Sequence, residues 1–241
     1  MQEEDDPRPR SAKARRGPGR PRGALDPGHD ERRRELATAA LGAVVQGGAR
    51  TSLHALARAT ECSIPTLRHY FGDRSGVIAA ALEGARALAE VHLARLADPG
   101  ALDLAASVRA VADDLVTAWV RHGVGRIFSA GLCAGIFDDL AGPGYLGGVL
   151  EPTLQAFEAR LRVHAGRGEL DLDDDDDEAI RAAGLAFLSP LILALLHQEG
   201  LGGRRCRPLD LAAFAEDHAA RFLRAYGRAP PTRPATRGRA R

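Results

Sequence analysis

The sequence predicts an all-α protein, and three observations support this fold class. Aromatic residues make up only 5% of the 241 residues and strand-forming side chains are sparse, whereas Ala and Leu, which favour helices, are abundant. Apolar side chains recur at helical spacing along most of the chain. Gly and Pro interrupt this pattern at intervals typical of helix ends, so we expect a series of helices around a buried core.

The first two helices are predicted from their apolar spacing and from the residues that flank them. A helix over residues 30–46 carries apolar side chains at helical spacing and ends before Gly47-Gly48. A second, short helix over residues 52–60 has Thr51 or Ser52 as its N-cap, because a hydroxyl there accepts a hydrogen bond from an otherwise unpaired backbone N–H.

A third helix follows after a tight turn and ends at Gly72-Asp73. Ser63 is a good N-cap, and Pro65 is tolerated in a first turn because the N–H that it lacks would be unpaired there. Leu56 and Leu67 are spaced to pack the second and third helices together. This arrangement is that of a helix-turn-helix, whose second helix enters the major groove of DNA.

A fourth helix is predicted to run to Asp98-Pro99-Gly100, which breaks the pattern. The longest nearly uncharged apolar run, Ala182–Leu196, has 15 residues. A membrane span needs about 20, so we expect a buried helix and no membrane partner. The chain begins without an apolar signal stretch and its cysteines are few and far apart, which favours a cytoplasmic protein. Further helices are predicted over residues 103–122, 125–140, 145–165, 176–199 and 210–226.

The formal net charge of +1 hides a segregation of charge along the chain. Residues 1–77 carry a net charge of +4, residues 78–227 a net charge of −8, and residues 228–241 a net charge of +5. Residues 7–25 contain seven basic and no acidic side chains. A basic segment ahead of a helix-turn-helix suits attraction to phosphates, whereas an acidic remainder is kept off the duplex.

Chemistry assigns roles to the side chains of the third helix. Arg68 can bind guanine with two hydrogen bonds, Thr66 can contact a base or a phosphate, and Ile64 and Pro65 can contact a thymine methyl group. Tyr70 and Arg74 suit phosphates, which set register without reading sequence. The predicted DNA-contacting residues of this region are Ser52, His54, Ser63, Ile64, Pro65, Thr66, Arg68, His69, Tyr70 and Arg74.

The segment TSLHALARATECSIPTLRHYFGDRSGVIAAAL, residues 51–82, resembles the DNA-binding segment of the tetracycline-repressor (TetR) family of transcription regulators. Three positions depart from the family pattern: Glu61 stands where the turn usually has Gly, Val44 replaces a Phe of the first helix, and Arg68 replaces a common Tyr. The residues that carry the resemblance are Thr51-Ser52-Leu53, Leu56-Ala57, Ser63, Leu67, Tyr70-Phe71, Asp73-Arg74 and Val77.

The resemblance implies a homodimer that binds a double-stranded DNA operator. It implies a helix-turn-helix head over residues 26–77 and a helical ligand-binding and dimerisation domain over residues 78–227. The last two helices of this family usually pair across the dimer as a four-helix bundle. Here the apolar seam of that bundle is expected from Leu185, Leu188, Leu191, Leu195, Leu211, Phe214 and Phe222.

Two low-complexity segments flank these domains, a basic arm over residues 1–25 and a basic tail over residues 228–241, and both are expected to be disordered. Arg20 and Arg22 lie in a Gly-Arg-Pro-Arg stretch similar to an AT-hook, which lies in a narrow A·T minor groove. The alternative is a solvated tail with general attraction to phosphates. Either interpretation predicts that the arm raises DNA affinity.

The predicted function is that of a repressor that leaves its operator when a small, largely apolar effector binds the C-terminal domain. The alternative is a constitutive or partner-controlled regulator without an effector. The sequence shows no nucleophile with a base partner and no metal-ligand spacing, so we expect no enzymatic activity, no cofactor and no metal. Phe157 and Asp138 are further candidates for the effector pocket, whose main predicted lining residues are Trp119, His122, Phe128, Cys133, Phe137, Tyr145 and Phe187.

Overall fold

The computed structural model describes residues 27–228, which are helical apart from short connections and one isolated antiparallel bridge between Leu170 and Gly227. The all-α prediction is confirmed. The predicted basic arm, with Arg20 and Arg22, lies outside the described residues, as does the predicted tail beyond residue 228.

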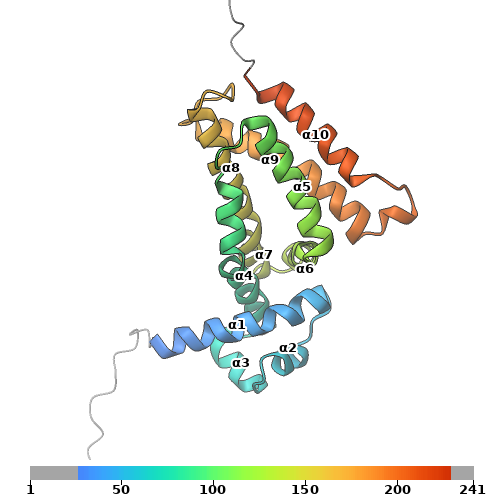
Figure 1. Ribbon diagram of the computed structural model, residues 1–241. Helices are drawn as coiled ribbons and strands as arrows, with labels where there is room; N and C mark the ends of the chain where they lie inside the picture. Colours follow the sequence, from blue (N-terminus) through green and yellow to red (C-terminus); the bar gives the residue numbers. More distant parts are fainter. Residues whose placement is uncertain (1–26, 229–241) are drawn as a thin grey trace, which may run out of the picture.

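The N-terminal helices form a small head, shown at the bottom of Figure 1. Each head helix lies within a few residues of its predicted range, and α1 begins three residues earlier than expected. The head comprises α1 (Pro27–Gly47), the 3₁₀ turn η1 (Gly48–Arg50), α2 (Leu53–Ala59) and α3 (Ile64–Phe71).

Helix α4 (Arg74–Ala97) runs from the head into the body and is the main connection between them. It packs against α1 and α3 in the head, and against α7, η2 and α8 in the body. The remaining elements of the body are α5 (Leu104–Arg121), α6 (Val124–Gly135), α7 (Ala141–Tyr145), the π-helical turn η2 (Leu146–Leu150), α8 (Glu151–Gly166), α9 (Asp177–Leu195), the π-helical turn η3 (Leu196–Gly200), the 3₁₀ turn η4 (Gly203–Arg205) and α10 (Leu211–Tyr226).

The middle of the body differs from the predicted helices over 125–140 and 145–165. Helix α6 ends at Gly135 and a turn separates it from α7; in this turn Asp138 accepts hydrogen bonds from the backbone N–H groups of Leu140 and Ala141, both at 3.0 Å. The second predicted helix begins earlier and contains the π-helical turn η2. Pro152, in the first turn of α8, has no N–H to donate to the preceding turn, which accounts for the irregular hydrogen bonding there.

The molecule has two hydrophobic cores, one after the other from the head toward the far end of the body. The first core joins the head to the body, because Leu56 and Leu67 of the head belong to one cluster with Trp119, Phe128 and Tyr145 of the body. The second core lies farther from the head and is built mainly from α5, α8, α9 and α10. Helices α5 and α10 lie side by side over this second core (Figure 1). The head is therefore packed onto the body through a shared apolar interior.

Candidate nucleic-acid interface

The connection between α2 and α3 is a tight turn closed by hydrogen bonds. The Thr60 hydroxyl donates to the carbonyl oxygen of Leu56 at 2.9 Å, and the backbone N–H of Cys62 donates to the carbonyl oxygen of Ala57 at 3.1 Å. Leu56 and Leu67, one from each helix, are fully buried in the same core. The arrangement is a helix-turn-helix with α3 as its second helix.

Glu61 occupies the left-handed position of this turn, with a φ of +51°. The TetR-family pattern usually has Gly here, since a side chain in this conformation costs about 1–2 kcal/mol. The turn keeps its left-handed residue although it lacks the glycine. The presence of Glu61 instead of glycine therefore does not change the turn, but it adds local backbone strain.

Helix α3 turns one face to the core and the others to solvent. Leu67 is fully buried, whereas Pro65, Arg68 and His69 are exposed. Residues near the start of such a helix face base edges when it enters a major groove. We call the six exposed and half-buried candidate residues of this helix the α3 face: Ile64, Pro65, Thr66, Arg68, His69 and Tyr70.

Two of the predicted contact residues are also N-caps. Ser63 Oγ accepts a hydrogen bond from the backbone N–H of Thr66 at 3.2 Å, and the two hydroxyl oxygens lie 2.8 Å apart. Ser52 Oγ accepts from the backbone N–H of Ala55 at 3.2 Å. Ser52 and Ser63 are both exposed, as is His54 beside the first of them. These caps fix where the two helices begin, and therefore where the α3 face points.

Arg74 holds the start of α4 against the head. Its Nε donates to the backbone carbonyl oxygen of Thr51 at 2.5 Å. Thr51 is buried, and its hydroxyl donates to the carbonyl oxygen of Gly48 at 2.8 Å. The predicted phosphate contact of Arg74 remains a prediction, and the structure adds this bracing contact to it.

An aromatic cluster joins the first turn of α1 to the last turn of α3. The ring of His29 lies 4.7 Å from that of Tyr70 and 5.7 Å from that of His69, measured between ring centroids. Beside them, the guanidinium of Arg33 lies 5.3 Å from the centre of the Phe71 ring. Sequence reasoning missed His29, because 40 residues separate it from His69 and no spacing rule connects them.

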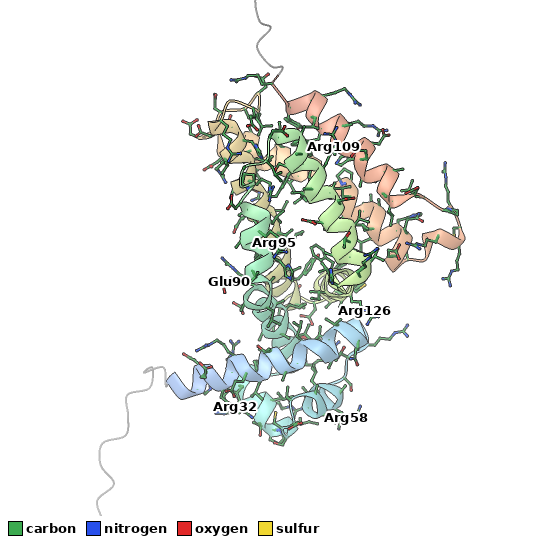
Figure 2. The ribbon with its side chains drawn as sticks, in the orientation of Figure 1. Arg32, Arg58, Glu90, Arg95, Arg109 and Arg126 are labelled. Carbon is green, nitrogen blue, oxygen red and sulfur yellow. The ribbon has the colours of Figure 1, made fainter. Side chains whose placement is uncertain are left out.

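Basic side chains occur on both sides of α3. Figure 2 shows Arg32 on α1 and Arg58 on α2, near the two ends of the head. Arg32 pairs with Glu35 at 2.8 Å, and this hydrogen bond and the negative charge of Glu35 raise the pKa of Arg32, although desolvation opposes the shift. Arg58 is exposed beside an open cleft along the α2–α3 turn, and the cleft is also lined by His54 and Glu61.

Asp138, a predicted polar anchor of the effector pocket, instead links the body to the start of α4. The hydroxyl of Ser75 donates to Asp138 Oδ2, while Asp138 Oδ1 accepts from the backbone N–H groups of Leu140 and Ala141. Burial opposes the charged form, but the hydrogen bonds from Ser75 and from the backbone of Ala141 and Leu140 outweigh it and lower the pKa of Asp138. The contact places a charged group of the α6–α7 connection directly on the helix that enters the head.

The predicted effector-lining residues fall into separate places. Trp119, Phe128 and Tyr145 come together, with ring centroids 5.2 Å and 6.3 Å apart along the series. All three are buried in the core shared with the head, and burial raises the pKa of Tyr145 to about 12. Phe187 lies in the second core, stacked on Phe157 at 4.8 Å. The remaining candidates face solvent: Phe137 is 87% exposed, and His122 and Cys133 are exposed as well.

Comparisons with solved structures identify the architecture. A protein from Mesorhizobium loti assigned to the TetR family of transcriptional regulators has a TM-score of 0.67 and 15% sequence identity, over 84% of this chain and 100% of that one. The chain has the fold of TetR-family regulators. The resemblance found in residues 51–82 therefore agrees with the tertiary structure.

Two further similar structures are those of a multidrug binding protein and of the repressor of a multidrug efflux pump. The multidrug binding protein EbrR, in complex with imidazole, has a TM-score of 0.55 and 21% identity, over 83% of this chain and 97% of that one. SmeT, the repressor of the Stenotrophomonas maltophilia multidrug efflux pump SmeDEF, has a TM-score of 0.53 and 19% identity, over 85% and 94%. No protein-family model and no curated protein matched the sequence. At these identities the structural likeness establishes the fold.

Proposed function

We propose that the chain is a sequence-specific DNA-binding transcription regulator of the TetR family and not an enzyme. The observation that carries this proposal is the α3 face, where a Ser63-capped helix buries Leu67 and leaves Arg68 open to solvent. An arginine in that position can make two hydrogen bonds to guanine in the major groove. Thr66, Ile64 and Pro65 supply the remaining base contacts in this proposal.

Phosphate contacts set the register of the head on the duplex. We assign them to Ser52, His54, Tyr70 and Arg74, with Ser63 and His69 at the two ends of α3. The basic arm adds Arg20 and Arg22, and the position of its attachment supports this role. Helix α1 begins at Pro27, and its first turn stacks on the α3 face through His29, so the start of α1 lies beside the proposed DNA surface.

The effector in this proposal is a small, largely apolar molecule bound in the body. The aromatic group of Trp119, Phe128 and Tyr145 suits it, because these rings share a core with the head. Tyr145 also belongs to α7, which is connected to α4 through the contacts of Asp138 with Ala141 and Ser75. EbrR, a multidrug binding protein, and SmeT, the repressor of a multidrug efflux pump, share the fold. In this proposal a ligand that moves α6 or α7 also moves α4, which enters the head, and thereby lowers the affinity of the head for DNA.

A regulator without an effector is the second candidate. The observation that favours it is that the predicted effector-lining residues do not converge: the Trp119 group lies in the first core, Phe187 lies in the second, and Phe137 is exposed. Under this alternative a partner protein or constitutive binding controls the chain. Release of the protein from DNA by a small molecule separates the two candidates.

The homodimer in this proposal forms through α9 and α10, with a seam that differs from the expected one. Leu188, Leu191, Leu195, Leu211 and Phe222 are buried within the protomer, and Phe214 is half-buried. Of the expected residues, Leu185 is exposed, at 39%, on the outer side of α9, where Leu193, which was not in the expected seam, is 66% exposed. A dimer places two α3 faces about 34–36 Å apart, one helical turn of DNA.

The apolar composition of α9 raises the question of whether this helix crosses a membrane or packs in a soluble dimer. The stretch Asp177–Gly200 is long and apolar enough to cross a membrane: its most apolar 18 residues have a mean hydropathy of 2.0, and 39% of these residues are buried. Core helices of soluble proteins have the same composition, and one side of this helix packs in the second core. We therefore propose that a second copy covers the other side of α9, in a cytoplasmic dimer.

A genomic footprint of the bound protein, repeated with candidate apolar ligands, tests the proposal. We expect discrete protected sites with two-fold symmetry, and loss of protection with the effector. Arg68→Ala should lose discrimination between the selected site and a scrambled duplex while it retains nonspecific binding, because a bidentate contact accounts for about 1–3 kcal/mol of discrimination. Sequence-independent binding by the wild-type chain would overturn the proposed function.

A further inference from the structure

The cluster of His29, His69 and Tyr70 joins two parts of the head that have different proposed tasks. His69 and Tyr70 belong to the α3 face, whereas His29 is in the first turn of α1. The rings of His29 and Tyr70 are inclined by 31°, and those of His29 and His69 meet edge to face at 81°. His69 and Tyr70 also meet edge to face, at 5.2 Å and 78°, so each ring of the trio contacts the other two.

These contacts restrict the side chains that they join. A tyrosine with one ring neighbour on α1 and another on α3 loses rotamer freedom in the free protein. The side chain of Tyr70 has then already lost conformational entropy before DNA binds. Fixing it in the complex therefore lowers the binding affinity less. The half-buried state of His29 and Tyr70 agrees with this, since neither ring is free in solvent.

We propose that His29 is a positioning residue for DNA binding that acts through Tyr70. This inference rests on the proposed function and adds to it a residue that neither the helix-turn-helix pattern nor the arm contains. His29 orients the Tyr70 hydroxyl toward the phosphate backbone, and it fixes the first turn of α1 next to the α3 face. Since Tyr70 contacts a phosphate in this scheme, the effect of His29 is independent of base sequence.

The test uses the full-length chain and two fluorescently labelled duplexes. One duplex carries the sequence that the wild-type chain selects from a random DNA pool, and the other has the same composition in scrambled order. We expect His29→Ala to weaken binding to both duplexes by about 2–10-fold, the range that an aromatic pair contributes. His29→Phe keeps a ring and should restore affinity to within about twofold of the wild type.

A double-mutant cycle separates positioning from a general structural role. In a Tyr70→Ala background, His29→Ala should add less than about twofold, because the group through which it acts is gone. His92→Ala, on the exposed part of α4 in the body, is the matched control and should leave affinity unchanged. Thermal unfolding of each variant confirms that the head is folded at the temperature of the binding assay.

The possible failures are distinct. An undiminished effect of His29→Ala in the Tyr70→Ala background, or no rescue by His29→Phe, overturns this inference and leaves the proposed function standing. If His29→Ala binds both duplexes with unchanged affinity, the inference is likewise overturned and the proposed function stands. A wild-type chain that selects no DNA sequence overturns the proposed function, and the inference that rests on it.

Discussion

The head and the middle of the body begin their helices in different ways. In the head, α2 and α3 each start at a serine whose hydroxyl accepts a hydrogen bond from the backbone, and Asp73 does the same for α4. In the middle of the body, α6 follows the left-handed Gly123 and α8 follows Leu150, and neither start has a side-chain cap. Local chemistry therefore defines the head, whereas packing against other elements defines the middle of the body.

The middle of the body depends on close backbone contact and on buried polar groups. Gly144 and Gly148 lie against the backbone of α4, with no room for a side chain. Arg160 of α8 is 5% exposed and donates to the carbonyl oxygens of Arg95, Leu96 and Asp98 at 2.6–2.9 Å, and to the Ser107 hydroxyl at 2.7 Å. Substitutions at such contacts should therefore change stability more than a substitution in the exposed α2–α3 turn of the head.

The largest effect is expected from Gly148→Val. A side chain at this position would overlap the carbonyl oxygen of Leu82 and the backbone of Glu83, which cannot move without displacing α4. We expect a loss of more than about 3 kcal/mol in the free energy of unfolding, measured by urea denaturation.

The control for this substitution is the neighbouring glycine. A side chain at Gly147 meets no atom within 4 Å, so Gly147→Ala should be neutral or stabilise by up to about 1 kcal/mol. Equal destabilisation by both variants would contradict the argument from close contact with α4.

The next largest effect is expected from Arg160→Met. The substitution keeps an apolar stem of similar length and removes every donor to the end of α4, so buried acceptors lose their partner. We expect a loss of about 2–3 kcal/mol in the free energy of unfolding. Arg109→Met is the control, because the Arg109–Glu216 pair (Figure 2 labels the arginine) is largely exposed and contributes about 0–1 kcal/mol. A similar loss in both variants would show that burial of Arg160 is unimportant.

A smaller effect, dependent on pH, is expected from His164 on α8. Its ring is fully buried, and Nδ1 lies 2.7 Å from Glu169 Oε2, which also accepts from the backbone N–H of Leu104. Burial lowers the pKa of His164 below its ordinary value of 6.5, although the hydrogen bond and charge of Glu169 oppose this. The native state therefore binds the proton less readily than the unfolded chain does.

The sign of the pH dependence follows from that difference. The contribution of His164 is fully present above pH 6.5 and is lost as the pH falls from there through the native pKa, with a slope of at most about 1.4 kcal/mol per pH unit. We expect His164→Gln to flatten this part of the stability curve, measured by urea denaturation between pH 7.5 and pH 5 at about half-unit steps. His92→Gln, at an exposed position, should leave the curve as it is. An identical slope for His164→Gln and wild type would count against a role for this histidine.

The smallest effect is expected in the head, from Glu61→Gly. Glycine removes the strain of a side chain at φ +51°, and it adds freedom to the unfolded chain that offsets part of this gain. We expect a net stabilisation of about 1 kcal/mol in the free energy of unfolding. Glu61→Ala, which keeps a side chain in the same conformation, is the control and should not stabilise. Destabilisation by Glu61→Gly would mean that the glutamate makes a contact more valuable than the strain that it causes.

The sequence predicted the head closely and the middle of the body less well, for the same physical reason. The limits of α2 and α3 follow from Ser52, Ser63 and Pro65, whose effects act within one helical turn. The break after Gly135 and the π-helical turn before Pro152 depend on how α7 and α8 lie against α4. The candidate pocket likewise divided into a buried group, a second core and exposed side chains, because spacing along a helix does not show which neighbour covers it.

By itself the sequence determined the fold class, the helix-turn-helix and the residues of the α3 face, because caps, breakers and apolar spacing act over a few residues. Only the tertiary structure decided that His29 stacks on Tyr70, that Ser75 meets Asp138 and that Arg160 closes the end of α4. Each of these contacts joins residues 41 to 65 positions apart, so it depends on the path of the chain between them. That path is set by the packing of all the helices together.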